Sequence, residues 1–275
     1  MTKVYVMHNV VKNSDSSRMI HRNCFDYESF SKWLQGRSDK FVSLSTALQD
    51  NTGDCITIDD ATMGAFDAAM LCAVHQHHAT LFVNPYYIVE KKQYWMHYLT
   101  LFIEQTKERF FSYHDDWFDL SLPQKRKKLR KTIKGELSKI ADEDGRIALI
   151  EQIFHRKTSE TELPYHLQTL SEEQLDILMD NEYVDIEYHG WTHGEISSMT
   201  LEQVKQELKL GRIWFRQRLN ADIHFFSLPF GKRQKQIEEI DDLPFILMGD
   251  CDYPDEFRDD HLHNRILINL TQQES

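Results

Sequence analysis

Short strand-like runs alternate with longer helical runs along most of this sequence. The segments "KVYVMH", "CITI", "TLFVN", "YVDIEYH" and "IHFFSLP" have the apolar, β-branched and aromatic character of strands, and "FVSL", "PFILMGD" and "RILINL" are similar. Helical periodicity fills most of the intervals, as in "GAFDAAMLCAVHQH" and "QYWMHYLTLFIEQTKERFF". Strands that alternate with helices predict βαβ units around a parallel sheet or barrel, so we expect an α/β fold.

The helix boundaries support this organisation. Ser171 precedes "EEQLDILMDN" with Gln174 three residues on, and Thr200 stands in the same relation to Gln203. This is the capping-box pattern of a helix N-terminus. From about residue 88 to residue 168 the apolar spacing is helical. The chain has 275 residues, of which 41% are hydrophobic, and this is enough for one large core, so a single domain is the default.

Composition narrows the class of protein. The formal net charge of −12 opposes broad binding to a nucleic-acid backbone, which requires a concentrated positive surface. We interpret the basic run "QKRKKLRKTIKG" as a solvated helix face rather than a site for an acidic polymer or a lipid surface. Four scattered cysteines and the lack of a charged-then-apolar leader favour a reducing, cytoplasmic setting. No apolar stretch approaches the roughly 20 residues of a membrane helix, so we expect no membrane span.

Polar residues follow the ends of several predicted strands. In parallel α/β folds, the loops that leave the carboxyl edge of the strands converge on one crevice. Side chains from distant parts of the chain are therefore expected to meet there. The candidates at this edge are His8, Asp59, Asp60, His189, Pro229, Phe230, Asp250 and Arg265.

Paired aspartates and paired histidines among these candidates suggest a metal site. Asp59 and Asp60 are adjacent like charges at a buried strand end and need a counter-charge. His189 and His193 in "HGWTH" are four residues apart, so both imidazoles can face one cation, to which a carboxylate adds a third ligand. Each pair alone also has a structural interpretation, because aspartates often cap helices and the chain has 14 histidines. Their joint occurrence at strand ends favours a divalent metal.

Three motifs carry a resemblance to a known family. "TIDDA", "HGWTH" and "LPFG" resemble, in order and spacing, the signature motifs of the polysaccharide deacetylase family, the carbohydrate esterases of family 4 with the chitooligosaccharide-deacetylase homology domain. "VYVMHNV", "DYESFSKWLQG", "FVSLSTAL" and "HATLFVNPYYI" are similar to its opening strand, first helix, second strand and Ala-Thr-Phe-Phe strand. The Pro-Phe-Gly third motif and the Arg-Ile of "HNRILI" resemble a variant branch. The resemblance implies a distorted (β/α) barrel, one domain over residues 1–275 with a helical insertion at about residues 95–165.

The resemblance also implies roles for individual residues. Asp60, His189 and His193 would bind a divalent metal, with zinc expected, and Asp59 would be the general base that activates a metal-bound water. That water would attack an N-acetyl carbonyl, and a backbone N–H near Phe230 would stabilise the oxyanion. The residues expected to shape the substrate site are Pro229, Phe230 and Gly231, together with Trp191, whose ring would stack on a sugar or serve only in packing.

Three positions depart from the family pattern. Ala61 replaces the glycine of the first motif, a mild change unless the loop needs a positive φ. Ser227 stands where an arginine would pair with the base, and Arg265 is our candidate substitute. The histidine of the final motif, which supplies the family's general acid, is missing from "ILINLTQQES". His8 is the candidate acid for the leaving amine, with a satisfied core or surface histidine as the alternative. The candidates to orient that acid are Asp250 and Asp252.

The expected function is therefore metal-dependent hydrolysis of an N-acetyl group on an amino sugar or glycan precursor. Two alternatives remain open: hydrolysis of a C–N bond in a non-sugar amide, and a sugar-recognition or scaffolding domain that kept the metal but lost turnover. The insertion is also expected to offer a surface for a partner or a second copy. The sequence does not define the oligomeric state.

Overall fold

A parallel barrel forms the centre of the unit that consists of Met1–Lys92 and Tyr165–Ser275. The structure is a computed structural model that describes residues 2–12, 24–140, 142–231, 240, 246–250 and 262–268. The barrel closes in the order β1-β11-β10-β9-β8-β5-β4, and all its strand pairs are parallel. Its strands are β1 (Val4–Met7), β4 (Cys55–Asp59), β5 (Ala79–Val83), β8 (Val184–Tyr188), β9 (Phe225–Ser227), β10 (Ile246–Asp250) and β11 (Leu262–Leu267). The predicted α/β barrel is confirmed.

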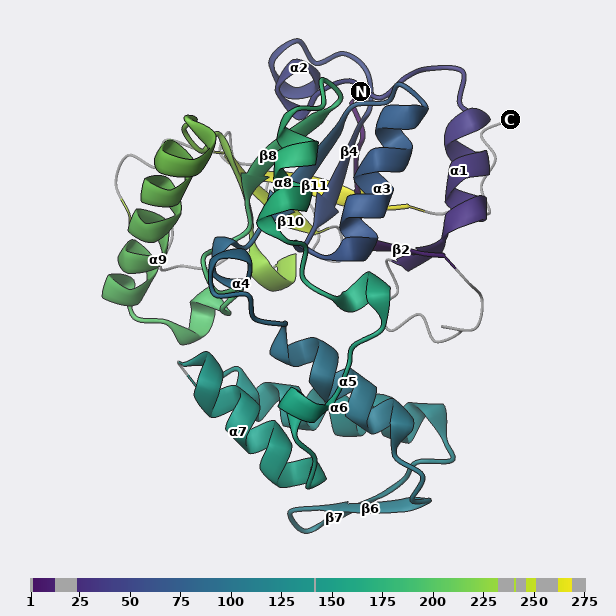
Figure 1. Ribbon diagram of the computed structural model, residues 1–275, viewed down its shortest axis with the longest axis vertical. Helices are drawn as coiled ribbons and strands as arrows, with labels where there is room; N and C mark the ends of the chain where they lie inside the picture. Colours follow the sequence, from purple (N-terminus) through teal and green to yellow (C-terminus); the bar gives the residue numbers. More distant parts are fainter. Residues whose placement is uncertain are drawn as a thin grey trace. The chain divides into compact units, whose positions relative to one another are not determined.

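Helices lie outside these strands, as Figure 1 shows for α3 and α8. Both predicted capping boxes are present: Ser171 with Gln174 opens α8, and Thr200 with Gln203 opens α9. Helix α9 continues into a π-helical turn over Phe215–Leu219. The helices of this part are α1 (Tyr27–Gln35), α2 (Leu44–Gln49), α3 (Met63–Val74), α4 (Pro85–Val89), α8 (Glu172–Met179) and α9 (Leu201–Trp214).

Side-chain alternation along the strands divides the core into two layers. Ile56 and Ile58 of β4 join the large cluster that packs under the outer helices, as do Leu81 of β5 and Tyr188 of β8. The intervening positions point into the barrel, where residues from β1, β4, β5, β9 and β10 meet Leu44 and Ala47 of α2. Because Val4 and Cys55 begin their strands, α2 packs against the amino end of the barrel.

The segment "FVSL", predicted to be a strand, is the main local difference within this part. No strand forms there, because Ser43 caps α2 by accepting a hydrogen bond from the Thr46 backbone N–H. The backbone N–H of Phe41 is satisfied by the His77 ring rather than by a neighbouring strand. A small parallel pair that the sequence did not indicate, β2 (Asn9–Val11) with β3 (Cys24–Asp26), follows β1.

Residues Gln93–Pro164 form a second compact unit, and Met1–Lys92 with Tyr165–Ser275 form the first. The second unit contains α5 (Trp95–Gln105), α6 (Pro123–Leu137) and α7 (Glu143–Phe154). The prediction of helix from the apolar spacing was wrong for residues 110–119, where β6 (Phe110–Tyr113) and β7 (Asp116–Asp119) pair as an antiparallel hairpin. The cross-strand pair Phe111–Phe118 explains this, because Phe118 is fully buried and Phe111 stacks on the ring of Phe154.

The predicted organisation was one domain with an insertion at about residues 95–165, and whether the two units fold as one domain stays a prediction. Within the second unit, the basic run lies on α6, and its apolar residues Leu129, Ile133 and Leu137 are buried. Among the described residues, no helix combines the length and apolar character needed to cross a membrane.

Candidate metal centre

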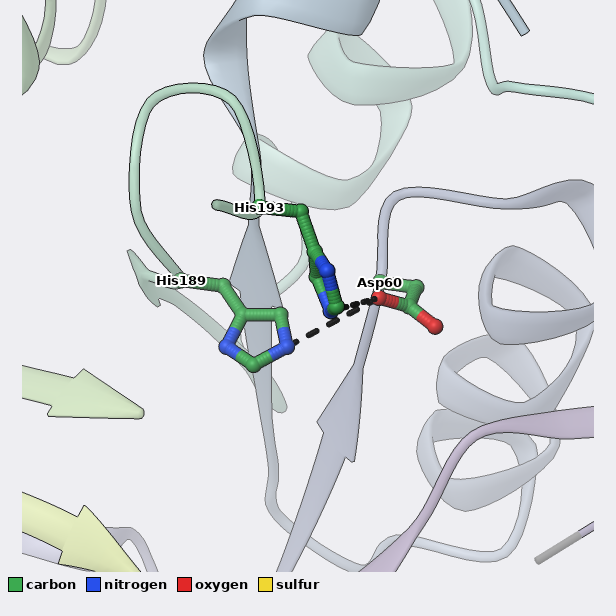
Figure 2. A group of neighbouring side chains, drawn as sticks. All are labelled: Asp60, His189 and His193. Atoms are coloured by element: carbon green, nitrogen blue, oxygen red, sulfur yellow. Dashed lines mark ion pairs between the residues drawn. The ribbon is translucent and has the colours of Figure 1, made fainter. Parts of the chain in front are cut away.

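One aspartate and two histidines converge at the carboxyl end of the barrel. Asp60 follows β4, while His189 and His193 follow β8. The Asp60 Oδ1 atom lies 3.3 Å from His193 Nε2 and 3.6 Å from His189 Nε2. Figure 2 shows both rings turned towards this carboxylate, and all three residues are at most 5% exposed. Their ligand atoms lie within 4.8 Å of one another, so these residues form a candidate three-ligand metal site.

A hydrogen bond of the His189 ring determines which ring nitrogen faces Asp60. Its Nδ1 lies 2.8 Å from the backbone carbonyl oxygen of Ser227. A carbonyl only accepts, so Nδ1 carries the proton and donates it. With Nδ1 as the donor, Nε2 is the ring nitrogen that faces Asp60 and can offer a lone pair to a cation, and a second hydrogen bond of this kind is typical of metal-ligating histidines.

Three non-glycine residues around the site have left-handed backbone conformations. The φ angle is 71° at Asp60, 53° at His193 and 64° at Phe230. Such angles cost roughly 1 kcal/mol or more per residue and concentrate at functional sites. Ala61 is not among the positive-φ residues, so the replacement of the family glycine introduces no backbone strain at this position.

Asp59 is held by a buried arginine. Arg265 Nη1 and Nη2 donate to Asp59 Oδ1 and Oδ2 at 2.6 and 2.7 Å, and the Ser227 hydroxyl donates to Oδ2 at 3.1 Å. Arg265 is 0% exposed and enters from β11, the strand from which the sequence predicted it to come. Two neighbouring aspartates therefore have different partners, since Asp59 faces a fixed cation and Asp60 faces two imidazoles.

These partners control the ionisation of Asp59. Burial by itself raises the pKa of Asp59, but the charge and hydrogen bonds of Arg265, together with the electrostatic influence of the nearby His189 and His8 rings, outweigh burial and hold this pKa well below its usual range. Asp59 is thus an ionised carboxylate at neutral pH. His8, just past β1 and half-buried, is close enough to contribute to this effect.

The loop that carries both histidines is fixed by residues that the sequence did not single out. Glu207 of α9 accepts hydrogen bonds from the backbone N–H groups of Trp191 and Thr192 at 2.7 and 3.1 Å, and from the Thr192 hydroxyl at 2.7 Å. The Asn84 amide donates to the carbonyl oxygens of His189 and Gly190. Asn84 directly follows β5, so the strand-end rule could have found it, whereas Glu207 lies mid-helix without any motif.

The residues predicted to shape the substrate site occupy the same end of the barrel. The Phe230 ring lies edge-on to the His193 ring, with centroids 4.9 Å apart. Pro229 and Gly231 are buried beside it, and Gly231 uses a φ of 67° that suits glycine. Trp191 is partly buried and packs against the outer core, and whether its ring also stacks on a sugar stays a prediction. Asp252, the Asp250 side chain and the chain after residue 268 lie outside the described residues.

The comparisons with known proteins agree with this fold and these motifs. The family model described as polysaccharide deacetylase matches residues 151–244, a range that contains "HGWTH" and "LPFG". The resemblance to the polysaccharide deacetylase family that the motifs indicated is therefore confirmed, and the variant branch stays a prediction. No protein of curated function matches the chain.

Solved structures share the fold at low sequence identity. A Streptococcus pyogenes deacetylase, PplD, in complex with acetate has 12% identity and a TM-score of 0.59, with 97% of this chain and 92% of that chain covered. IcaB from Ammonifex degensii has 11% identity and a TM-score of 0.56, covering 98% and 91%. A de-N-acetylase from Aggregatibacter actinomycetemcomitans has 9% identity and a TM-score of 0.57, covering 99% and 96%. These likenesses support the deacetylase-type barrel.

Proposed function

We propose that this chain is a metal-dependent deacetylase that hydrolyses the N-acetyl group of an amino sugar or glycan precursor. The observation that carries the proposal is the convergence of Asp60, His189 and His193 beside an Asp59 held by Arg265. This arrangement lies at the carboxyl end of a barrel, in a chain that matches the polysaccharide deacetylase family.

The donor set fits a divalent metal, and zinc is the proposed identity. Two imidazoles and one carboxylate are ligands that zinc accepts, and three protein ligands leave positions for water and substrate. The fit rests on the buried, convergent ligand atoms and on the His189 tautomer that frees Nε2. When bound, the metal would supply Lewis acidity that makes water more acidic and polarises the acetyl carbonyl.

Asp59 is the proposed proton acceptor for the attacking water. Its carboxylate is ionised, and Arg265 and Ser227 fix its orientation through three hydrogen bonds. A carboxylate with a lowered pKa is a weak base, so the proton is passed on rather than kept. Arg265 is thus a positioning residue, because it acts through Asp59.

The remaining roles complete a hydrolysis of the amide. The backbone N–H near Phe230 is proposed to donate to the oxyanion that forms at the carbonyl, and the strained φ of Phe230 fixes the direction of this part of the chain. His8 is proposed to donate a proton to the leaving amine, since it lies close enough to Asp59 to influence its charge. The Trp191 ring is proposed as a wall of the sugar site.

Acetate release from N-acetylglucosamine oligomers tests the proposal. Asp59→Asn should lower turnover by roughly two to four orders of magnitude while metal content is kept. Asp39→Asn, which alters an exposed aspartate of the same unit, is the matched control and should leave turnover unchanged. Melting temperatures of both variants show whether each of them is folded.

Other outcomes select the alternatives. Metal without any acetate release from oligomers, monomers or small amides would support a recognition or scaffolding domain. Hydrolysis of small amides with no action on N-acetylhexosamines would support a different C–N hydrolase. Equal turnover in wild type and Asp59→Asn would contradict the proposed role of Asp59 as the proton acceptor.

A further inference from the structure

The amino end of the barrel contains a second polar cavity, far along the strands from the metal centre. Its volume is about 470 Å³, and it lies between β5, β8 and β9, with α2 and the chain before β9 as its other walls. The polar residues that line it are Ser45, Gln49, Thr80, Asp185, Glu187, Asp222 and His224. A cavity of this size accommodates a small organic molecule.

The cavity exists because two barrel strands diverge. Strand β8 pairs with β9 at Tyr188 and Phe226, close to the carboxyl end. Nearer the amino end, the Glu187 carboxylate accepts the backbone N–H groups of His224 and Phe225, each at 3.0 Å, where a strand would otherwise pair. Glu187 therefore bridges the seam, and the space below it opens to the outside.

Two neighbouring polar groups in this cavity lack partners among the described residues. The Thr80 hydroxyl is buried, with the residue 1% exposed, and has no hydrogen-bond partner. Asp185 is the register partner of Thr80 on the adjacent strand, so both side chains lie on the same, inner face of the sheet. Asp185 is exposed, and the described residues provide it with neither a hydrogen bond nor an ion pair, although the charges of His78 and His224 act on its carboxylate. A buried hydroxyl without a partner is costly, and this cost is removed by a ligand that hydrogen-bonds to it.

The lining defines the chemistry of that ligand. Asp222 is paired with Arg216 and the Glu187 carboxylate accepts two backbone N–H groups, so Asp185 is the carboxylate of this lining that favours a positively charged group. The apolar side chains of Met179, Leu219 and Phe225 add a surface for a C–H face. A hydroxylated primary amine satisfies all of these features, with its ammonium at Asp185 and a hydroxyl at Thr80. We propose that the amino end of the barrel binds an amino sugar in its free-amine form.

Calorimetric titration with glucosamine tests this site, with N-acetylglucosamine and glucose as neutral comparisons. We expect saturable binding of glucosamine, and at least about tenfold weaker binding of both neutral sugars, because they lack the charge-assisted bond. Asp185→Asn should weaken glucosamine binding by about tenfold or more for the same reason. Asp39→Asn removes an exposed carboxylate elsewhere and should have no effect.

Thr80→Val provides a second test that does not depend on charge. Valine fills the same volume without the hydroxyl, so the variant should melt at an equal or higher temperature than wild type and bind glucosamine several-fold more weakly. A lower melting temperature would show that the hydroxyl has a structural partner, and would overturn the proposal.

The metal centre must be separated from this cavity, because a deacetylase could also hold an amine product there. His193→Ala should leave glucosamine binding unchanged if the amino end is the site. Binding that is lost in His193→Ala and kept in Asp185→Asn would overturn the proposal. So would the absence of saturable glucosamine binding in wild type. The test needs no turnover, so its failure is distinct from failure of the proposed deacetylase function.

Discussion

The two ends of strand β8 show how one barrel can treat polar side chains differently. At the carboxyl end, His189 is held through its ring by Ser227 and through its backbone carbonyl by Asn84, and it faces Asp60. At the amino end, four residues earlier, Asp185 faces a cavity without a bonded partner among the described residues. Side chains that are fixed by hydrogen bonds suit catalysis, which needs a defined geometry. Side chains without a hydrogen-bond partner are instead available to bind a ligand.

The strongest test of this contrast is the buried ion pair at the carboxyl end. Arg265→Met should lower the free energy of unfolding by about 3–5 kcal/mol, because it leaves the Asp59 charge buried without its main partner. Denaturant titration of metal-free protein measures this loss. The control is Arg216→Met, which removes an exposed ion pair with Asp222 and should cost about 1 kcal/mol or less. Similar costs for both variants would show that the Asp59 pair is not important for stability.

A pH-dependent effect is expected at the amino end, where His77 precedes β5. Its Nδ1 accepts from the Phe41 N–H and its Nε2 donates to the Leu34 carbonyl, so the ring is held neutral. Burial lowers the pKa of His77 from 6.5 to about 4. The unfolded chain therefore takes up a proton first, and stability present above pH 6.5 falls as the pH drops towards 4, by roughly 3 kcal/mol at most.

Unfolding free energies of wild type and His77→Gln across this range measure the contribution. The variant should be less stable near neutral pH and should show a flatter slope, so that the two curves approach each other in acid. His75→Gln, at a half-buried histidine two residues earlier, is the control and should keep the wild-type slope. Parallel curves for wild type and His77→Gln would contradict this assignment.

A smaller effect is expected where Glu207 supports the histidine loop. Glu207→Gln should weaken metal binding by about 10- to 100-fold, because an amide cannot accept all three hydrogen bonds that the carboxylate receives. Metal affinity by competition with a chelator measures the change. Glu202→Gln, at an exposed position in the first turn of the same helix, is the control and should bind metal like wild type. An unchanged affinity in Glu207→Gln would remove its positioning role.

The smallest effect concerns Ala61. Ala61→Gly restores the family residue, but the position does not use a positive φ, so glycine gains nothing and costs about 0.5–1 kcal/mol through chain entropy. Melting temperature and acetate release should therefore fall slightly or stay level. A clear rise in either quantity would show that the loop needs glycine after all.

Much of the barrel could be predicted, because buried parallel strands leave a local pattern. "CITI" and "YVDIEYH" are strands as expected, and their ends placed Asp59, Asp60 and His189 at one edge. The prediction of a strand at "FVSL" was wrong because the capping hydrogen bond of Ser43 starts a helix there, which strand propensity alone does not reveal. The sequence did not predict the hairpin at residues 110–119, because its two strands are short and lie between long helices.

The sequence could predict those residues of the candidate site that lie on or next to a barrel strand. Arg265 was a candidate because it enters the last strand, and the structure places it on Asp59. Ser227 was read as a lost arginine, yet its hydroxyl and carbonyl bind Asp59 and His189. Glu207 reaches the loop from a distant helix, and no sequence pattern reports a contact of that kind.

Metal content of the purified protein is the decisive measurement for the proposed metal centre. Elemental mass spectrometry of wild type, His189→Ala and His193→Ala, with His75→Ala as control, measures the metal bound per chain. We expect about one metal per chain in wild type and in the control, and its loss in the two loop variants. Wild type that binds no metal even after zinc is supplied, or metal that both loop variants retain, would contradict the assignment of Asp60, His189 and His193 as ligands.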